Sequence, residues 1–327
     1  MKKFDVVALG ELLIDFTENG TSTQGNPVLE ANPGGAPCNV LAMLNKLGKK
    51  TAFIGKVGND TFGRQLAEEV QQSGTDTTNL IFDDTVHTTL AFVHTFPDGE
   101  REFSFYRNPG ADMMLKKEEV MEDIIKEAKI FHFGTLSSTH EGVREATRYA
   151  IDIAKESGAM ISFDPNLREP LWDSPEDARK EIEYGLSKCD ILKISDNEVE
   201  FMTGTKDYSK GVEILREQYD IKIVFVTLGK DGSRAYYKDL MAEQPTFTQI
   251  KAIEKTGAGD TFEGCALNYL LEHDIDSMTE NDLSDLLVFA NAGASLITTR
   301  KGALKVMPAK SEIEDIISSH NIISYNI

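Results

Sequence analysis

Short apolar runs and segments with helical hydrophobic spacing follow one another along most of the chain. The runs Phe4–Leu9, Thr51–Val57, Ile130–Phe133 and Ile191–Ile194 are typical of buried strands. Apolar positions three and four residues apart predict helices in between, for example over residues 141–156. Strands that alternate with helices build parallel sheets with helices on both faces. The pattern therefore predicts an α/β protein.

One stretch interrupts this alternation. Two strand-like runs, Thr88–Phe96 and Arg101–Arg107, follow each other without a helix, and Pro97–Glu100 between them has the composition of a hairpin turn. We expect a small antiparallel flap over one end of the main sheet. Arg107 stands at the base of this flap, where a cation would either hold a substrate oxygen or pair with a carboxylate.

A bare loop leads into a predicted helix near residue 257. Gly257, Ala258 and Gly259 leave the backbone N–H groups uncovered, and helical spacing begins directly after them. The N-terminus of a helix has unpaired donors and a partial positive charge, which suit a phosphate or a developing negative charge. Asp260 would repel a phosphate but could take a proton from a hydroxyl that attacks one. The alternative is a simple turn in which Asp260 caps the helix.

A second glycine-rich loop, Asn32–Asn39, precedes another predicted helix. Gly34 and Gly35 would let a ligand approach the backbone closely, and the amide of Asn39 would reach the same ligand. An ordinary loop and helix cap would explain these residues equally well. Asp15 lies inside an apolar segment, where an acid is costly to bury unless it is hydrogen-bonded. It either faces solvent from an edge strand or binds hydroxyl groups in a cleft.

Polar residues recur where the predicted strands end. Asp164–Arg168 follows one strand, and Thr227–Gly232 follows another. In an open α/β sheet the ligand crevice lies outside the carboxyl ends of the strands, so these segments indicate one crevice. Asn197 and Glu200 follow a third strand. Their spacing is close to that of a capping box, and it would also let both side chains orient a hydrated Mg²⁺.

The composition narrows the possible functions. Acidic residues outnumber basic ones 54 to 34, and the net charge of −20 argues against a nucleic-acid or anionic-membrane surface. We find no apolar segment of membrane-spanning length and no signal peptide, which predicts a cytoplasmic protein. The three cysteines and six histidines have no disulfide or metal-ligand spacing. A P-loop and a Gly-x-Gly-x-x-Gly dinucleotide motif are both missing.

The two glycine-rich loops together resemble the early and late signatures of the ribokinase-like (PfkB-type) family of carbohydrate kinases. The matching residues are Gly34–Asn39, Gly55 and Gly58 in the early signature, and Thr256–Phe262 with Gly264 in the late one. Residues 107–112 and 164–168 resemble the fructokinase branch. The resemblance covers essentially the whole length. It implies one kinase domain over residues 1–327 with a ribokinase-like three-layer αβα fold, a mainly parallel central sheet, and a small β lid from about 12–33 and 86–110, through which homodimers often form.

The resemblance also implies roles for single residues. Asp260 would be the general base on a sugar hydroxyl, and the backbone of Gly257, Ala258 and Gly259 would form an anion hole. The sugar would be held by Asp15, Gly34, Gly35 and Asn39, with Arg107 and Asn166 as further candidates. The nucleotide is expected near Lys193, Thr227, Gly229, Gly232 and Asn291. Asn197 and Glu200 match the family's Asn-x-x-Glu element, which acts on Mg²⁺ and phosphate, here through water.

One segment departs from the family. Its members often have Asp-Thr-Thr before the late glycine loop, and the Asp helps to build a monovalent-cation site. This chain has Glu254, Lys255 and Thr256 there. Because Glu is longer than Asp and Lys255 brings its own ammonium group, the sequence leaves open whether K⁺ activates the protein. Lys255 could instead add positive charge near the phosphates of ATP.

We therefore expect ATP- and Mg²⁺-dependent phosphorylation of a sugar, with D-fructose to D-fructose 6-phosphate as the first hypothesis. The partners would be the sugar and ATP, without nucleic acid or membrane. The nearest alternatives are other acceptors, such as 2-keto-3-deoxygluconate, ribose or a nucleoside. A non-catalytic sugar-sensing protein is an alternative of another class, although Asp260 and the two glycine loops weigh against it.

Overall fold

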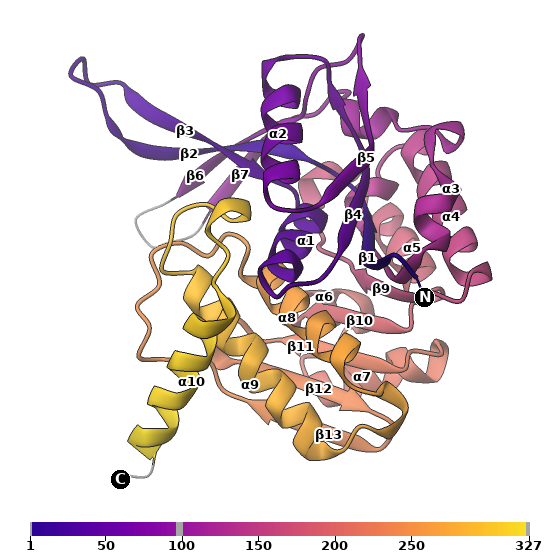
Figure 1. Cartoon of the computed structure of the whole chain (residues 1–327), viewed down its shortest axis with the longest axis vertical. Coiled ribbons are helices and arrows are strands. Elements are labelled where there is room, and N and C mark those ends of the chain that lie inside the picture. Colours follow the sequence, from indigo (N-terminus) through magenta and orange to yellow (C-terminus); the bar gives the residue numbers. More distant parts are fainter. Residues whose placement is uncertain (1, 96–100, 325–327) are drawn as a thin grey trace.

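The computed structural model of the protein describes residues 2–95 and 101–324. Its larger sheet has the strand order β13-β12-β11-β10-β9-β8-β1-β4-β5 (Figure 1). The strands from β11 to β5 are parallel, and β12 and β13 are added antiparallel at one edge. The predicted mainly parallel sheet is confirmed. Its strands are β1 (Phe4–Leu9), β4 (Thr51–Gly58), β5 (Asp76–Asp83), β8 (Ala128–Gly134), β9 (Met160–Asp164), β10 (Ile191–Ser195), β11 (Ile223–Thr227), β12 (Ser233–Tyr237) and β13 (Leu240–Gln244).

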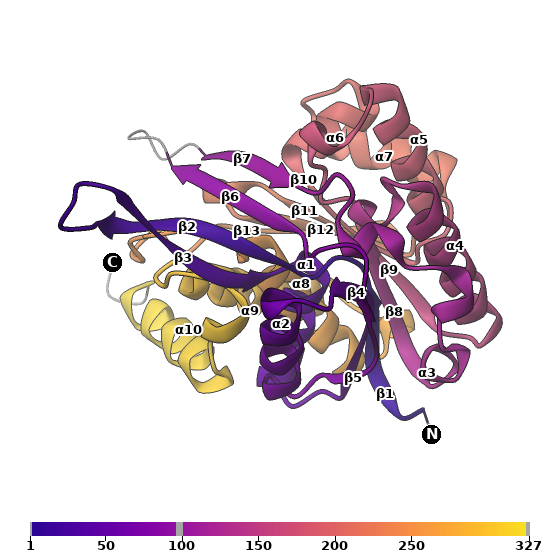
Figure 2. The same cartoon turned by 90° about the horizontal axis from the view of Figure 1, so that it is seen from above.

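Helices cover both faces of this sheet, because successive side chains of a strand point to opposite sides. In β1, Val6 and Ala8 belong to one hydrophobic cluster, whereas Val7 and Leu9 belong to the other. The first cluster takes side chains from α1 (Ala36–Lys46), α2 (Thr61–Gln72), α8 (Ala258–Glu272), α9 (Glu280–Ile297) and α10 (Lys310–Ser324). The second takes them from α3 (Glu122–Lys126), α4 (Glu141–Glu156), α5 (Pro175–Leu186), α6 (Asp196–Thr203) and α7 (Tyr208–Gln218). The expected three layers are visible from above in Figure 2.

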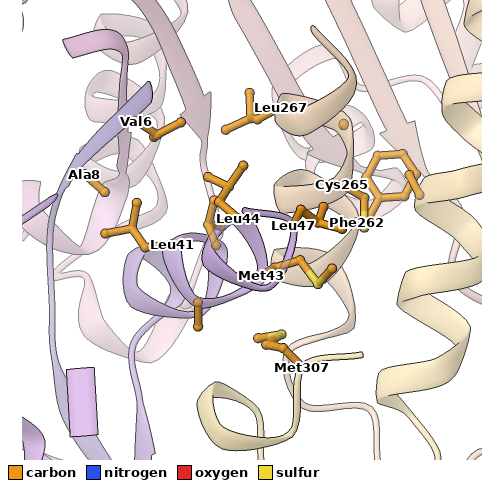
Figure 3. Close-up of a cluster of buried hydrophobic side chains, with 14 of the residues drawn as sticks. Val6, Ala8, Leu41, Met43, Leu44, Leu47, Phe262, Cys265, Leu267 and Met307 are labelled. Atoms are coloured by element: carbon orange, nitrogen blue, oxygen red, sulfur yellow. The ribbon is translucent and has the colours of Figure 1, made fainter. Parts of the chain in front are cut away.

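Two helices that are far apart in the sequence meet in the first of these clusters. A Cβ atom added at Gly264 of α8 would lie 2.7 Å from the Cβ atom of Met43 in α1, so the two helices pack at close range. Figure 3 shows Met43 and Phe262 within this cluster. Burial of a side chain such as Phe262 contributes roughly 1.5–3 kcal/mol. The packing anchors the beginning of α8 beside α1 and so decides where Asp260 lies.

A smaller sheet, with the strand order β3-β2-β6-β7, stands at one end of the larger sheet. It consists of β2 (Leu13–Thr21), β3 (Pro27–Gly34), β6 (Leu90–Thr95) and β7 (Arg101–Tyr106). Strand β2 pairs antiparallel with β3 and parallel with β6, while β6 and β7 form the predicted antiparallel hairpin. The predicted turn over residues 97–100 lies outside the described residues. In Figure 2 the hairpin of β2 and β3 projects beyond the body of the molecule.

The sequence pattern does not predict the strands β3, β5, β12 and β13. Strand β12 lies between β11 and β13, whereas the other three lie at sheet edges. In β3, β5 and β13 most side chains are exposed or half-buried, so these three strands lack the apolar run that marks a core strand. For the same reason, residues 32–34 resemble a loop in the sequence although they form the last part of β3. The structure assigns these residues to the smaller sheet, and they lead directly to Gly35, which lines the cavity described next.

Candidate active site

A cavity of about 350 Å³ lies at the carboxyl ends of the parallel strands, where both glycine loops meet. Its walls come from the segments after β1 and β9, from the starts of α1 and α8, and from the smaller sheet. The lining residues are Glu11, Leu13, Asp15, Gly35, Ala36, Asn39, Phe105, Leu136, Asn166, Arg168, Lys193, Lys255, Thr256, Gly257, Ala258, Gly259 and Asp260. Two loops that lie more than 200 residues apart thus form one site, as the open α/β architecture predicts.

Asp260 is the third residue of α8, and Gly257 precedes the helix. Gly257 has φ 75°, a left-handed conformation that residues with a Cβ atom rarely adopt. The N–H of Ala258 donates to the carbonyl oxygen of Lys255 at 3.3 Å, so this predicted anion-hole donor is engaged in the turn. In the described part of the chain, no hydrogen-bond acceptor is found for the N–H groups of Gly259 and Asp260, or for that of Gly257 directly before the helix. The first turn of α8 therefore offers two donors to an anion, and Gly257 offers a third.

Asn39 contacts the carboxylate of Asp260 directly. Its Nδ2 donates to Oδ2 of Asp260 at 2.8 Å, a contact between residues 221 positions apart in the chain. The Oδ1 atom of Asn39 is buried and has no hydrogen-bond partner among the described residues. Since a buried acceptor without a donor is unfavourable, this oxygen suits the hydroxyl group of a ligand.

The surroundings of Asp260 favour a proton-accepting role. Burial raises the pKa of Asp260 above its usual range, and the nearby carboxylate of Asp164 acts in the same direction. The hydrogen bond from Asn39 and the positive charges of Lys193 and Arg168 act in the opposite direction. A carboxylate with a raised pKa is a stronger base, which is what removal of a hydroxyl proton requires.

Lys193 and Asp164 form a buried ion pair beneath the late glycine loop. Their Nζ and Oδ2 atoms are 2.8 Å apart, and a Cβ atom at Gly259 would lie 3.1 Å from the same Nζ. Burial opposes the charge on Lys193, but the carboxylates of Asp164 and Glu198 outweigh it and raise its pKa. Lys193 thus lies in the same cavity as Asp260, where its fixed positive charge would attract a phosphoryl group.

Of the predicted sugar-binding residues, Asp15, Gly35, Asn39 and Asn166 line the cavity, whereas Gly34 does not. Asp15 stands in β2, which is an inner strand of the smaller sheet and not the edge strand that one alternative assumed. A Cβ atom at Gly34 would lie 2.3 Å from Oδ2 of Asp15, so this glycine leaves room for the carboxylate. Asn166 lines the cavity after β9, and its N–H donates to Oδ1 of Asp164 at 3.1 Å. Phe105 of the smaller sheet adds an apolar surface.

Comparison with known proteins decides the family. The family model described as "pfkB family carbohydrate kinase" matches residues 3–310. The chain belongs to this family. A relative named "Probable fructokinase-2" from Arabidopsis thaliana is 44% identical over 309 residues, which cover 94% of each chain.

Solved structures of similar kinases have the same fold. A fructokinase from Xylella fastidiosa with bound ATP has a TM-score of 0.89 and 31% identity, and the match covers 98% of this chain and 100% of that one. A fructokinase double mutant from Vibrio cholerae O395, solved with fructose, ADP and a potassium ion, has a TM-score of 0.87 and 29% identity, with 97% and 99% covered. The ribokinase-like fold and the assignment as a carbohydrate kinase are thereby confirmed.

Arg107 does not line the cavity of this kinase. Its guanidinium group donates to Asp112 (Nε to Oδ2, 2.8 Å), to the hydroxyl of Thr139 (2.7 Å) and to the carbonyl oxygen of Leu136 (3.0 Å). Arg107 and Asp112 are both buried. Of the two alternatives for Arg107, the structure supports the pair with a carboxylate, because these internal acceptors engage the cation that was expected to hold sugar.

The residues predicted to bind the nucleotide lie in different parts of the structure, and only Lys193 lines the cavity. Thr227 ends β11, Gly229 and Gly232 lie in the connection to β12, and none of the three lines the cavity that contains Asp260. Asn291 is buried in α9, where its Oδ1 accepts from the hydroxyl of Ser233 and its Nδ2 donates to backbone carbonyl groups at the end of β13. Asn291 thus joins α9 to the sheet edge, and its role toward a nucleotide stays a prediction.

The capping box near the predicted magnesium element involves other residues than expected. Ser195 is the N-cap of α6 and Glu198 closes the box, whereas Asn197 lies exposed in the first turn. The carboxylate of Glu200 is half-exposed and lies 3.5 Å from the ammonium group of Lys206. Amide and carboxylate oxygens on one turn are hard donors that fit a hydrated Mg²⁺. The described residues contain no cluster of three or more His, Cys, Asp or Glu side chains that would hold a metal directly.

Three charged residues that line the cavity have no role in sugar binding or proton transfer among the predictions from the sequence. Arg168 follows Asn166 by two positions, and this spacing after a strand end is the signal that could have identified it. Lys255, for which only a charge near ATP was considered, also lines the cavity, as does the buried acid Glu11. Within residues 2–95 and 101–324, no helix is long and apolar enough to cross a membrane.

Proposed function

We propose that this kinase transfers the γ-phosphoryl group of ATP to D-fructose and forms D-fructose 6-phosphate and ADP. The observation that carries the proposal is the place of Asp260, whose carboxylate shares one cavity with two unpaired N–H groups at the start of α8. The names of the similar proteins support fructose as the acceptor, and the Vibrio cholerae relative was solved with fructose and ADP.

The reaction needs a base on one side of the transferring group and positive charge on the other. Asp260 takes the proton of the primary hydroxyl, whose oxygen then forms the bond to phosphorus while the bond to the leaving ADP breaks. The N–H groups of Gly259 and Asp260, the helix dipole and the ammonium group of Lys193 stabilise the negative charge of the phosphoryl oxygens. Alignment of the two substrates within the cavity lowers the barrier further.

The remaining residues divide between the two substrates. Asp15, Asn39 and Asn166 bind the sugar hydroxyls, beside the backbone of Gly34 and Gly35. The nucleotide lies toward Thr227, Gly229 and Gly232, with Lys255 near its phosphates. Asn197 and Glu200 would hold, through water, the Mg²⁺ that comes with ATP. Magnesium supplies charge neutralisation between the phosphates when it is bound.

The whole chain forms one kinase domain, and the smaller sheet, from about residues 12–33 and 86–110, acts as a lid over the sugar. A homodimer through this lid and a cytoplasmic location complete the proposal.

An acceptor panel tests this proposal. Purified protein is incubated with Mg²⁺, ATP and one of D-fructose, 2-keto-3-deoxygluconate, ribose or a nucleoside, and the release of ADP is measured with and without K⁺. The highest kcat/KM is expected for fructose. A higher value for another acceptor would refute the sugar assignment, and binding of sugar without release of ADP from any acceptor would indicate a non-catalytic sensor.

A further inference from the structure

Glu11 is a buried acid to which the sequence analysis assigns no catalytic or binding role. It follows β1 by two residues, its exposed fraction is 3%, and it lines the large cavity together with Asp15 and Asn39. It also borders a second cavity of about 10 Å³, which has room for about one water molecule, beside His132. Because a carboxyl group is costly to bury, its position requires a hydrogen-bond partner.

The partner of Glu11 is the first residue of α1. Its Oε1 accepts the N–H of Ala36 at 2.8 Å, and this N–H has no acceptor inside the helix. The N-cap residue Gly35 provides no side-chain cap, and a Cβ atom on it would lie 2.4 Å from the carbonyl oxygen of Glu11. Glu11 therefore caps α1 from a distant part of the chain and stands in tight contact with the early glycine loop.

The same turn of α1 leads to the general base. The backbone N–H of Asn39 donates to the carbonyl oxygen of Gly35 at 3.0 Å, and its side chain donates to Asp260 at 2.8 Å. These contacts connect Glu11, through one helical turn, to the carboxylate that removes the proton. A displacement of a reacting group by about 1 Å can lower the rate by about 10²-fold. A small shift at the start of α1 could therefore reach Asp260 through Asn39 and lower the rate.

We propose that Glu11 is a positioning residue for phosphoryl transfer: its side chain holds the start of α1 and thereby keeps Asn39 against Asp260. This inference rests on the proposed function of Asp260 as general base. The role depends on the reach of the side chain and not on its charge. Burial raises the pKa of Glu11 to about 7, and an oxygen of either protonation state can accept the N–H of Ala36.

Two substitutions separate reach from charge. Glu11→Gln keeps the length of the side chain and an acceptor oxygen, whereas Glu11→Asp keeps the charge but withdraws the carboxylate by one methylene group. We expect Glu11→Asp to lower kcat by about tenfold or more and Glu11→Gln to stay within about threefold of the wild type. Glu213→Asp, at an exposed position of α7, is the matched control for the loss of a methylene group.

A pH profile adds a readout that a loss of stability alone would not move. The hydrogen bond from Asn39 lowers the pKa of Asp260, so its loss in Glu11→Asp should shift the acidic limb of kcat/KM to higher pH. Other charged groups that act on Asp260, or on which it acts, and that this substitution leaves in place are Asp164, Lys193, Arg168 and the buried Glu263 of the same helix.

Each variant is assayed with the acceptor on which the wild type is most active. A failure with fructose alone would then refute the sugar assignment and leave this comparison intact. The inference is overturned if Glu11→Gln loses as much activity as Glu11→Asp, if only the KM for the sugar changes, or if the acidic limb stays in place.

Discussion

The substitution Asp260→Asn separates the chemical role of this residue from its structural one. The amide has the size of the carboxylate, and its oxygen can still accept the hydrogen bond that Nδ2 of Asn39 donates at 2.8 Å. The amide cannot take a proton at neutral pH. The fold and the ligand contacts should therefore persist while the base is lost.

The expected magnitude follows from general acid–base catalysis. Loss of the base should lower kcat by about 10²–10⁴-fold, which corresponds to about 3–5 kcal/mol of transition-state stabilisation. Folding should not suffer. Because burial raises the pKa of Asp260, the folded state binds its proton more tightly than the unfolded chain, and the stability contribution of this group falls as pH rises. At neutral pH the uncharged variant should unfold at the same temperature as the wild type or higher.

Three measurements test this reasoning together. Release of ADP in the presence of fructose gives kcat, calorimetric titration gives ATP affinity, and thermal unfolding gives stability. Asp239→Asn, at an exposed turn position between β12 and β13, is the matched control. A variant of Asp260 that is folded, binds ATP and retains kcat within about threefold would refute its role as the base.

Further predictions concern the charges around the cavity. Lys193→Met leaves the carboxylate of Asp164 buried without its partner, so chemical denaturation should show that the free energy of unfolding falls by about 3–5 kcal/mol. The double variant with Asp164→Asn should regain part of this stability. Equal losses in the single and the double variant would contradict the pairing. Lys255→Met should raise the KM for ATP without a change in unfolding temperature, because Lys255 is exposed at the cavity; an unchanged KM would exclude a contact with phosphate. Replacement of K⁺ by choline should change kcat less than about twofold, because both oxygens of Glu254 already accept hydrogen bonds from Thr256 and Gly302; a larger loss would reveal a functional cation site.

The local pattern of the chain was sufficient for most of the fold. A largely apolar run predicts a buried strand such as Phe4–Leu9, and apolar positions three and four residues apart predict the helices. The glycines before α1 and α8 identified two helix starts, and Asp260 stood out because an acid beside such a start is unsuited to bind phosphate. Edge strands such as β3 were not predicted, because most of their side chains are exposed or half-buried and their composition resembles a loop.

Only the tertiary structure decided which of these groups meet. Asn39 reaches Asp260 because α1 and α8 pack together, and Arg107 is engaged by Asp112 because the chain folds back at the base of the smaller sheet. Glu11 caps a helix that begins 25 residues later. Hydrophobic periods and turn residues act over a few neighbours and can be read along the chain. Contacts between distant residues depend on strand order, register and helix packing, which no short segment determines by itself.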